Sequence, residues 1–218
     1  MNGPHDLGGQ HGLGPINPEP ETEEHVFHGD WERRVFALTL TCGMLGQWSI
    51  DEGRYARERQ HPVDYLSNTY YENWLAGLET LLVEKGLVTA NELVTGVVES
   101  VAEGYQVPDV DATKKMLANG GPTRMESDIT PSFSVGDKVR VINQNPLTHT
   151  RAPRYTRNHT GTIELGHGVH VFADANAHGR HQGVHLYAVR FEADELWGKK
   201  TPGGSVYVDL WEPHLEPV

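Results

Sequence analysis

The hydrophobic pattern of the chain changes at residues 119–142, which are NGGPTRMESDITPSFSVGDKVRVI. The first part, 119–132, begins Asn119-Gly120-Gly121-Pro122 and continues with polar residues to Pro131, which indicates a linker. The second part, 133–142, has the apolar pattern of a strand that is entered through the turn Gly136-Asp137. We therefore expect different kinds of structure before and after this stretch.

The segment after the linker shows short strands separated by turns that contain glycine. Further strand candidates are 160–163, 169–172, 186–191 and 206–211, and 193–198 interrupts them as a short helical turn. Several short strands in one small segment are typical of a small antiparallel barrel. We predict such a β-barrel domain over residues 133–218.

The segment before the linker has helical periodicity, and we predict a helical domain over residues 26–118. Asp30 is expected to cap a first helix. Three later helices should each begin at a capping box, in which Ser or Thr is followed three residues later by Glu, at 49–52, 69–72 and 89–92. The first of these three should run to about Gln60, and the last should end near Gly104. The expected fold class is therefore α+β, helical first and β second.

Residues 1–25 are rich in Gly and Pro and contain few large apolar side chains. Two interpretations remain open from the residues alone. The segment is either a disordered tail or an extended arm that another subunit orders, with Leu7, Leu13 and Ile16 as its anchors.

Charge and cysteine content exclude several classes of protein. The 218 residues carry a net charge of −12, and after residue 132 the nine Lys and Arg balance the nine Asp and Glu. An acidic chain without a basic face is a poor ligand for nucleic acid or anionic membranes. The one cysteine, Cys42, cannot form an internal disulfide and is interpreted as a structural thiol. No signal peptide or membrane-length apolar run is present, so we expect a cytoplasmic location.

The thirteen histidines do not predict a metal site in this chain. The tightest pairs, His167 with His170 and His178 with His181, lie in Gly-broken strand or loop sequence, where positions i and i+3 point to opposite sides. No cysteine or carboxylate cluster joins them, and we predict no metal ligands here. A Gly-x-Ser-x-Gly hydrolase motif and a dinucleotide-binding setting are also missing from the sequence.

One basic cluster stands out in this acidic chain. Residues 149–159 contain Arg151, Arg154, Arg157 and two histidines but no acid. Arginine suits a planar or oxygen-rich anion, although salt bridges to acidic residues are an equally simple explanation. Arg54 and Glu58 stand at i and i+4, as in a helix-stabilising ion pair.

Three aromatic residues form a second cluster at the start of the predicted helix after the 69–72 box. Tyr70, Tyr71 and Trp74 are typical of a core, and they are also compatible with an apolar ligand pocket.

Several segments, in order along the chain, resemble nitrile hydratase β subunits. They are 1–9 (MNGPHDLGG), 27–32 (FHGDWE), 51–54 (DEGR), 62–71, 81–86 (LLVEKG), 135–139 (VGDKV), the 149–157 loop, 195–198 (ELWG) and 208–212 (VDLWE). The resemblance implies an N-terminal arm, a helical domain and a C-terminal SH3-like antiparallel barrel. It also implies that residues 1–25 wrap an α subunit.

The resemblance further implies how the active site is shared. The α subunit binds low-spin Fe(III) or non-corrin Co(III) through backbone amides and cysteines, two of them oxidised, and this chain contributes Arg54 and Arg151 as hydrogen-bond donors to the oxidised cysteines. Ile50, Tyr70 and Trp74 match the substrate pocket. Glu58 is expected to orient Arg54. Gly53 stands where some relatives carry a bulky aromatic, which would open the pocket to larger nitriles.

The implied activity is hydration of a small-molecule nitrile to its amide by an αβ heterodimer, further dimerised to α2β2. Three alternatives remain at this point. They are a subunit of the related thiocyanate hydrolase, a non-catalytic metallochaperone, and a free-standing anion-binding module.

Overall fold

Two compact units make up the chain, whose structure, a computed structural model, describes residues 1–199 and 203–218. The helical unit comprises His11–Gly121, and the sheet unit comprises Met1–Gln10 together with Pro122–Val218. The division after Gly121 lies inside the segment 119–132, where the sequence predicts a linker. The predicted order, helices first and strands second, is confirmed.

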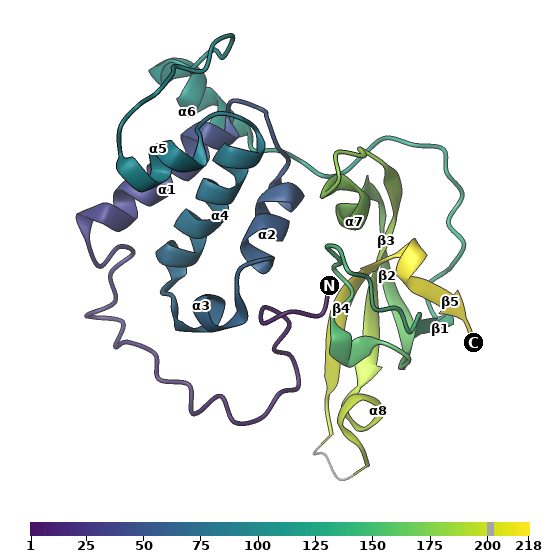
Figure 1. Ribbon diagram of the computed structural model, residues 1–218. Coiled ribbons are helices and arrows are strands. Elements are labelled where there is room, and N and C mark those ends of the chain that lie inside the picture. Colours follow the sequence, from purple (N-terminus) through teal and green to yellow (C-terminus); the bar gives the residue numbers. More distant parts are fainter. Residues whose placement is uncertain (200–202) are drawn as a thin grey trace. The chain divides into compact units, whose positions relative to one another are not determined.

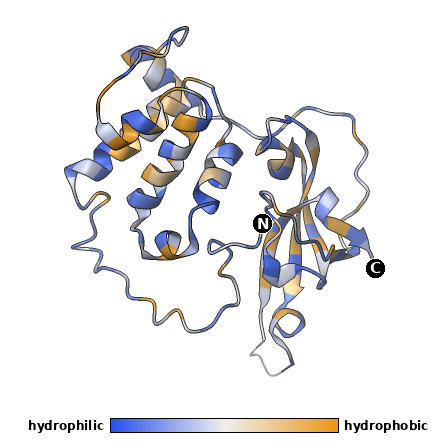
Figure 2. Cartoon of the chain, viewed as in Figure 1, coloured by the Kyte–Doolittle hydropathy of each residue, from blue (hydrophilic) through white to orange (hydrophobic). Residues whose placement is uncertain are grey.

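The helical unit is built on α1 (Asp30–Gly43), α2 (Ile50–Glu58) and α4 (Tyr70–Glu84). Helix α4 packs against both α1 and α2 (Figure 1). The buried side chains of these helices include Val35, Ala56, Leu78 and Leu81, and Figure 2 shows hydrophobic segments on all three. The shorter helices are α3 (Pro62–Ser67), α5 (Ala90–Thr95) and α6 (Val110–Asn119). None of the helices in the described residues is both long and apolar enough to cross a membrane.

The three capping boxes are confirmed at the starts of α2, α4 and α5, with Ser49, Thr69 and Thr89 as N-caps. In each box the Glu three residues later accepts from the cap backbone, so two backbone N–H groups that lack helical partners are satisfied. The first helix differs by one residue from the prediction. Its N-cap is Gly29, and Asp30 is the first helical residue, where its negative charge suits the positive end of the helix dipole.

Helix α5 is much shorter than the sequence predicts. It ends at Thr95, because Gly96 adopts a left-handed conformation with φ of 67° and closes the helix. The prediction that this helix extends to about Gly104 is therefore wrong. Residues 97–109 are not helical, and α6 begins only at Val110, after the N-cap Asp109.

The sheet unit holds a five-stranded antiparallel sheet with strand order β4-β3-β2-β1-β5. The strands are β1 (Lys138–Val141), β2 (Thr160–Val171), β3 (Gly183–Glu192), β4 (Ser205–Trp211) and β5 (Leu215–Pro217), accompanied by η1 (Arg154–Thr156), α7 (Ala173–Asn176), α8 (Ala193–Trp197) and η2 (Glu212–His214). Strand β2 joins two segments that the sequence predicts as separate strands. Register shifts on either side of Glu164 and His167 accommodate an extra residue each, so one strand continues through the Gly-rich middle.

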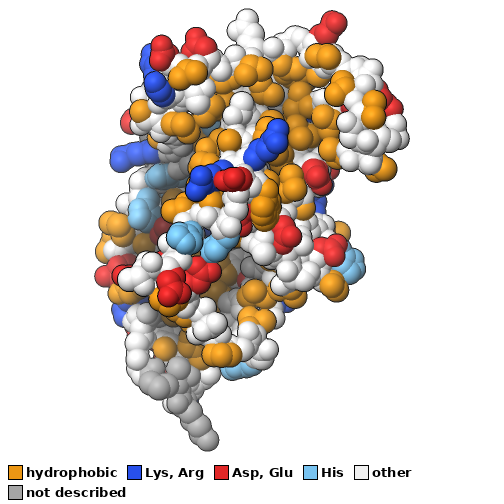
Figure 3. Space-filling view, turned by 90° about the vertical axis from the view of Figure 1, so that its left-hand side faces the viewer, with side chains coloured by type: hydrophobic (Ala, Val, Ile, Leu, Met, Phe, Trp, Pro, Cys, Tyr) orange, Lys and Arg blue, Asp and Glu red, His pale blue; other side chains and the backbone are white. Residues whose placement is uncertain are grey.

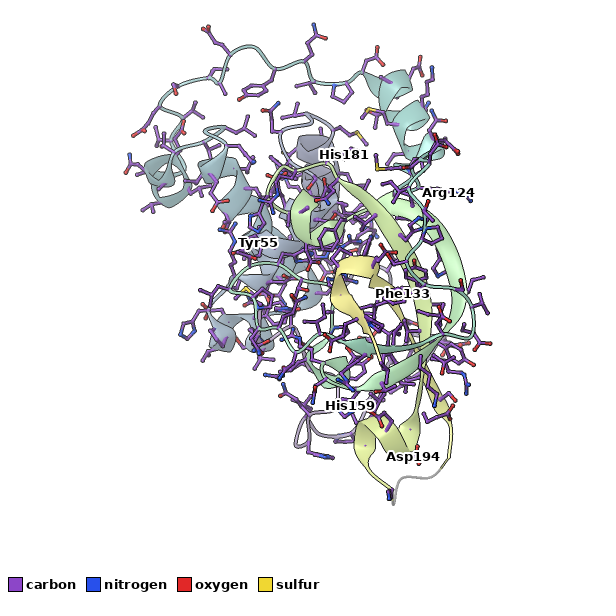
Figure 4. The ribbon with its side chains drawn as sticks, turned by 90° about the vertical axis from the view of Figure 1, so that its right-hand side faces the viewer. Tyr55, Arg124, Phe133, His159, His181 and Asp194 are labelled. Atoms are coloured by element: carbon purple, nitrogen blue, oxygen red, sulfur yellow. The ribbon has the colours of Figure 1, made fainter. Side chains whose placement is uncertain are left out.

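The core of the sheet unit lies on one face of this sheet. Val139, Ile163, Val189 and Leu210 are almost fully buried there, together with Tyr187, Phe191 and smaller neighbours. Phe133, labelled in Figure 4, precedes β1 instead of beginning it. Its ring packs edge-on against Tyr187 at a centroid distance of 5.9 Å. The predicted strand from 133 is thus shortened to Lys138–Val141, and Phe133 serves as a core residue from a loop.

The sheet is open in the described residues, because no ladder joins its two edge strands, β4 and β5. The antiparallel β character predicted for 133–218 is confirmed, whereas the closed SH3-like barrel is not shown by the strand pairing.

Candidate functional site

A cavity of about 820 Å³ lies in the helical unit between α1, α2, α4 and the end of α6. Three of the site residues predicted from the sequence line it, namely Ile50, Arg54 and Trp74. Gly53 also lines it, and a Cβ atom added there would meet nothing within 4 Å. The missing side chain at position 53 therefore leaves open space in the cavity, while the expected access for larger nitriles stays a prediction.

Arg54 sits on α2 with its guanidinium fixed by a carboxylate. Its Nη1 donates to Asp51 Oδ1 at 2.6 Å, and Asp51 is buried. The carboxylate that contacts Arg54 at this distance is Asp51, three residues earlier. Glu58 is buried on the same helix, and its role in orienting Arg54 stays a prediction. The side chain of Arg54 remains 38% exposed.

Tyr70 belongs to an aromatic cluster beside the cavity. Its side chain is exposed, and its ring lies 5.2 Å from that of Tyr71 and 5.6 Å from that of Trp74. Tyr70 is not among the described residues that line the cavity, while its neighbour Trp74 is. Tyr71 is buried and fits the interpretation as a core residue. Trp74 lines the cavity and fits the interpretation as a pocket residue.

The sequence did not single out Arg57, which also lines the cavity. Its Nε donates to the carbonyl oxygen of Gly53 at 3.1 Å, and its guanidinium lies over the Trp74 ring at 4.9 Å. Burial lowers the pKa of Arg57 from its ordinary value, although the side chain remains a cation.

The three arginines of the 149–159 loop have different environments in the sheet unit. Arg157 is buried, donates to the carbonyl oxygen of Ala152 at 3.2 and 3.0 Å, and lies 3.8 Å from the carboxylate of Asp6. Arg154 is exposed and donates to the backbone oxygen of Asp6. Arg151 is exposed, and within the described residues its guanidinium has no hydrogen bond or ion pair. The salt-bridge explanation thus fits Arg157, and Arg151 remains available.

The backbone of Arg151 is held by a partly buried carboxylate from α7. Asp174 on α7 accepts from the Arg151 N–H at 3.0 Å and contacts His214 Nε2 at 2.9 Å. Burial alone would raise the pKa of Asp174, but hydrogen bonds from His214, Thr150 and the Arg151 backbone lower it overall. Neither Asp174 nor His214 was identified from the sequence, because nothing local marks a contact between residues so far apart.

The first ten residues pack on the sheet unit of their own chain. The side chain of Asn2 donates to Asn145 at 2.8 Å, and Asp6 accepts from the Arg154 N–H at 2.8 Å. Gly8 lies against the ring of Tyr155, where an added Cβ would be 2.3 Å away. The start of the 1–25 segment is therefore ordered by this chain, and the predicted wrapping of a partner stays a prediction.

Within residues 1–199 and 203–218, no three His, Cys, Asp or Glu side chains gather as a metal site. In the pair His167 and His170, the ring centroids lie 6.4 Å apart, and each side chain contacts a different polar partner. His167 contacts Asp209 at 3.0 Å, and His170 contacts the Thr123 hydroxyl at 3.0 Å.

Comparison with known families covers almost the whole chain. The family described as "Nitrile hydratase beta subunit, N-terminal" matches residues 1–123, and "Nitrile hydratase beta subunit, C-terminal" matches residues 122–217. The chain belongs to the nitrile hydratase β-subunit family. The resemblance found in the sequence is confirmed.

Relatives within the nitrile hydratase β-subunit family match over their full length. The chain is 42% identical to the nitrile hydratase subunit beta of Pseudomonas putida, with 100% of both chains covered. It is 38% identical to the low-molecular weight cobalt-containing nitrile hydratase subunit beta of Rhodococcus rhodochrous, again over 100% of both. The thiocyanate hydrolase subunit beta of Thiobacillus thioparus is 35% identical over 44% of this chain and 58% of its own, and is a more distant relative.

Proposed function

We propose that this chain is the β subunit of a nitrile hydratase, in an assembly that hydrates nitriles to amides. The observation that carries the proposal is the full-length relation, at 42% identity, to a nitrile hydratase subunit beta. The family matches cover both the helical unit and the sheet unit. A metallochaperone resembling mainly the helical half, or a thiocyanate hydrolase with the two halves on separate subunits, fits this continuous match less well.

The metal belongs to the α subunit in this proposal, as Co(III) or Fe(III), and supplies Lewis-acid activation when bound. Two relatives are named as cobalt-containing. The donors on this chain suit an oxygen-rich centre held by a partner. Arg54 is held by Asp51 and still partly exposed, and Arg151 has an uncommitted guanidinium.

The role we assign to this chain is to hold hydrogen-bond donors and part of the substrate pocket. Arg54 and Arg151 donate to the oxidised cysteines of the α subunit, which a planar guanidinium suits better than an ammonium group. Ile50 and Trp74 line the pocket, and Tyr70 packs on Trp74 at its edge. Asp51 holds Arg54 through a hydrogen bond, and Glu58 is the second carboxylate that we assign to orienting it.

The α subunit is the partner that we propose for the exposed apolar surface of this chain. Figure 3 shows hydrophobic side chains spread over one face of the molecule. In the helical unit, Val94, Val98 and Val101 are all at least 73% exposed, which is unusual for large apolar residues near one another in sequence. The proposal includes an α2β2 assembly, an SH3-like barrel for 133–218, and a cytoplasmic location.

The proposal is tested by purifying the chain, with a tag, from cells that also express the nitrile hydratase α subunit of the same organism. We expect a second, cysteine-bearing chain to co-elute with cobalt or iron, and the complex to convert acrylonitrile to acrylamide. A chain that elutes alone and forms no amide would favour the anion-binding module. A complex that hydrolyses thiocyanate and leaves acrylonitrile intact would favour the thiocyanate hydrolase.

A further inference from the structure

The cavity of the helical unit is lined by Arg57, a cation that forms no ion pair within the described residues, although the neighbouring Glu58 carboxylate acts on it electrostatically. Arg57 uses its Nε for the Gly53 carbonyl oxygen at 3.1 Å and places its guanidinium over Trp74 at 4.9 Å. Within the described residues, its Nη1 and Nη2 atoms have no hydrogen bond or ion pair. The other arginines of the same segment differ in this respect, since Arg54 pairs with Asp51 and Arg59 pairs with Glu84.

Two further polar groups in the cavity wall lack partners within the described protein. The indole Nε1 of Trp74 and the hydroxyl of Thr39 are both buried without a hydrogen bond, and both residues line the cavity. A buried donor without an acceptor costs about 1–3 kcal/mol. Three donors around one cavity therefore favour a ligand that brings acceptors.

The local structure creates room for Arg57 and for a ligand beside it. Helix α4 carries Gly77 under the Arg57 side chain, where an added Cβ would lie 2.5 Å from Arg57 Cγ. At Gly53 nothing lies within 4 Å of an added Cβ. The first glycine lets the arginine lie against α4, and the second leaves the adjacent space open.

We propose that this cavity selects nitriles whose far end carries a hydrogen-bond acceptor, a carboxylate above all, and that Arg57 binds that group. The inference rests on the proposed function. A guanidinium offers a carboxylate two parallel donors. An apolar tail in the same place leaves the donors unpaired, and a site with unpaired buried donors discriminates strongly against such a tail.

The test compares two substrates of similar shape in the assembled αβ enzyme, 4-cyanobenzoate and 4-methylbenzonitrile. The measured quantity is the ratio of their kcat/KM values. Arg57→Met should lower this ratio by about tenfold or more, mainly through KM for 4-cyanobenzoate, because the charge-assisted hydrogen bonds from the guanidinium to the carboxylate are lost. Arg57→Lys, which keeps the charge, should restore part of the ratio.

Arg59→Met is the matched control, because Arg59 lies two residues away, pairs with Glu84 and does not line the cavity. Its ratio should equal that of the wild type. If Arg57→Met changes the ratio less than twofold, or no more than Arg59→Met does, the inference is overturned.

If Arg57→Met fails to assemble, the KM values of the wild-type enzyme for the two substrates test the inference. We expect its KM for 4-cyanobenzoate to be lower than its KM for 4-methylbenzonitrile, and an equal or higher value overturns the inference. An enzyme that hydrates 4-methylbenzonitrile without this preference leaves the proposed function intact. An assembly that hydrates no nitrile overturns both.

Discussion

The carboxylate of Asp174 accepts a hydrogen bond from the backbone N–H of Arg151 at 3.0 Å, although the two residues are 23 positions apart. The other Asp174 oxygen contacts the fully buried His214 at 2.9 Å. The exposed guanidinium that we assign to the partner's metal centre therefore extends from a backbone that the carboxylate of Asp174, itself in contact with His214, holds in place. Placement of Arg151 depends on α7 and η2 as much as on its own loop.

Removal of this carboxylate should weaken both the sheet unit and the activity. Asp174→Ala leaves the Arg151 N–H and the buried His214 without their acceptor, so we expect a loss of about 2–3 kcal/mol in the free energy of unfolding. Urea unfolding of the full chain, followed by tryptophan fluorescence, measures this. Asp209→Ala is the control, because Asp209 pairs with His167 at the surface and should cost less than about 1 kcal/mol. Equal losses in unfolding free energy for Asp174→Ala and Asp209→Ala would contradict the claim that Asp174 holds the Arg151 backbone in place.

The contribution of Asp174 should also depend on pH in the acid range. Hydrogen bonds hold its pKa below the ordinary value in the folded chain, so the charged form stabilises the fold above the unfolded pKa of about 3.9. This stabilisation is lost as the pH falls through the folded pKa. We expect the gap in unfolding free energy between wild type and Asp174→Asn to be present above about pH 5 and to shrink below about pH 4. A gap that widens on acidification would contradict the assigned direction.

Arg157 should control the order of the first ten residues. Its buried guanidinium contacts Asn2 and lies 3.8 Å from the Asp6 carboxylate. Arg157→Met leaves Asp6 without this cation, so we expect a loss of about 3 kcal/mol in stability and faster amide hydrogen exchange in residues 1–10. Arg154→Met, at an exposed side chain, should change the exchange less. Unchanged exchange in Arg157→Met would show that the segment is held by other contacts.

Two glycines of the helical unit should respond to alanine in opposite directions. Gly53→Ala places a methyl group in open space within a helix, which should stabilise the chain by about 0.5–1 kcal/mol. Gly77→Ala should destabilise it, because the new methyl group would lie 2.5 Å from Arg57 Cγ. Thermal and urea unfolding of both variants check this pair. A destabilising Gly53→Ala would mean that the space beside α2 is filled.

The parts of the fold that local sequence determines could be predicted from the sequence. The capping boxes at Ser49, Thr69 and Thr89 are complete within four residues, and all three mark true helix starts. The end of α5 was missed because apolar valines continue past Gly96, whereas the left-handed glycine ends the helix. The continuity of β2 was missed because its extra residues and glycines hide the alternation that a strand normally shows.

The residues of the candidate site were harder to predict from the sequence than the helix starts, because their contacts join distant parts of the chain. Residue chemistry identified the 149–159 loop but could not separate its arginines, and resemblance to a family selected Arg151. The difference between Arg151 and the other two arginines depends on Asp6, which contacts both Arg154 and Arg157. Asp6 lies 148 positions before Arg154, so the loop sequence does not reveal these contacts. The contact between Arg54 and Asp51, three residues earlier on the same helix, was not singled out from the sequence, because spacing alone does not distinguish it from other possible pairs. Tertiary contacts supply what the pattern lacks.

The most direct test of the central claim is nitrile hydration by the assembled αβ enzyme carrying Arg151→Lys, with Arg154→Lys as the matched control from the same loop. Metal content per αβ pair is measured in the same samples. If Arg151 donates to the partner's oxidised cysteines, Arg151→Lys should lower kcat by about 100-fold or more with metal content intact, which corresponds to about 2.7 kcal/mol, while Arg154→Lys should stay within a few-fold of wild type. Near-normal kcat in Arg151→Lys, at full metal content, would contradict the claim.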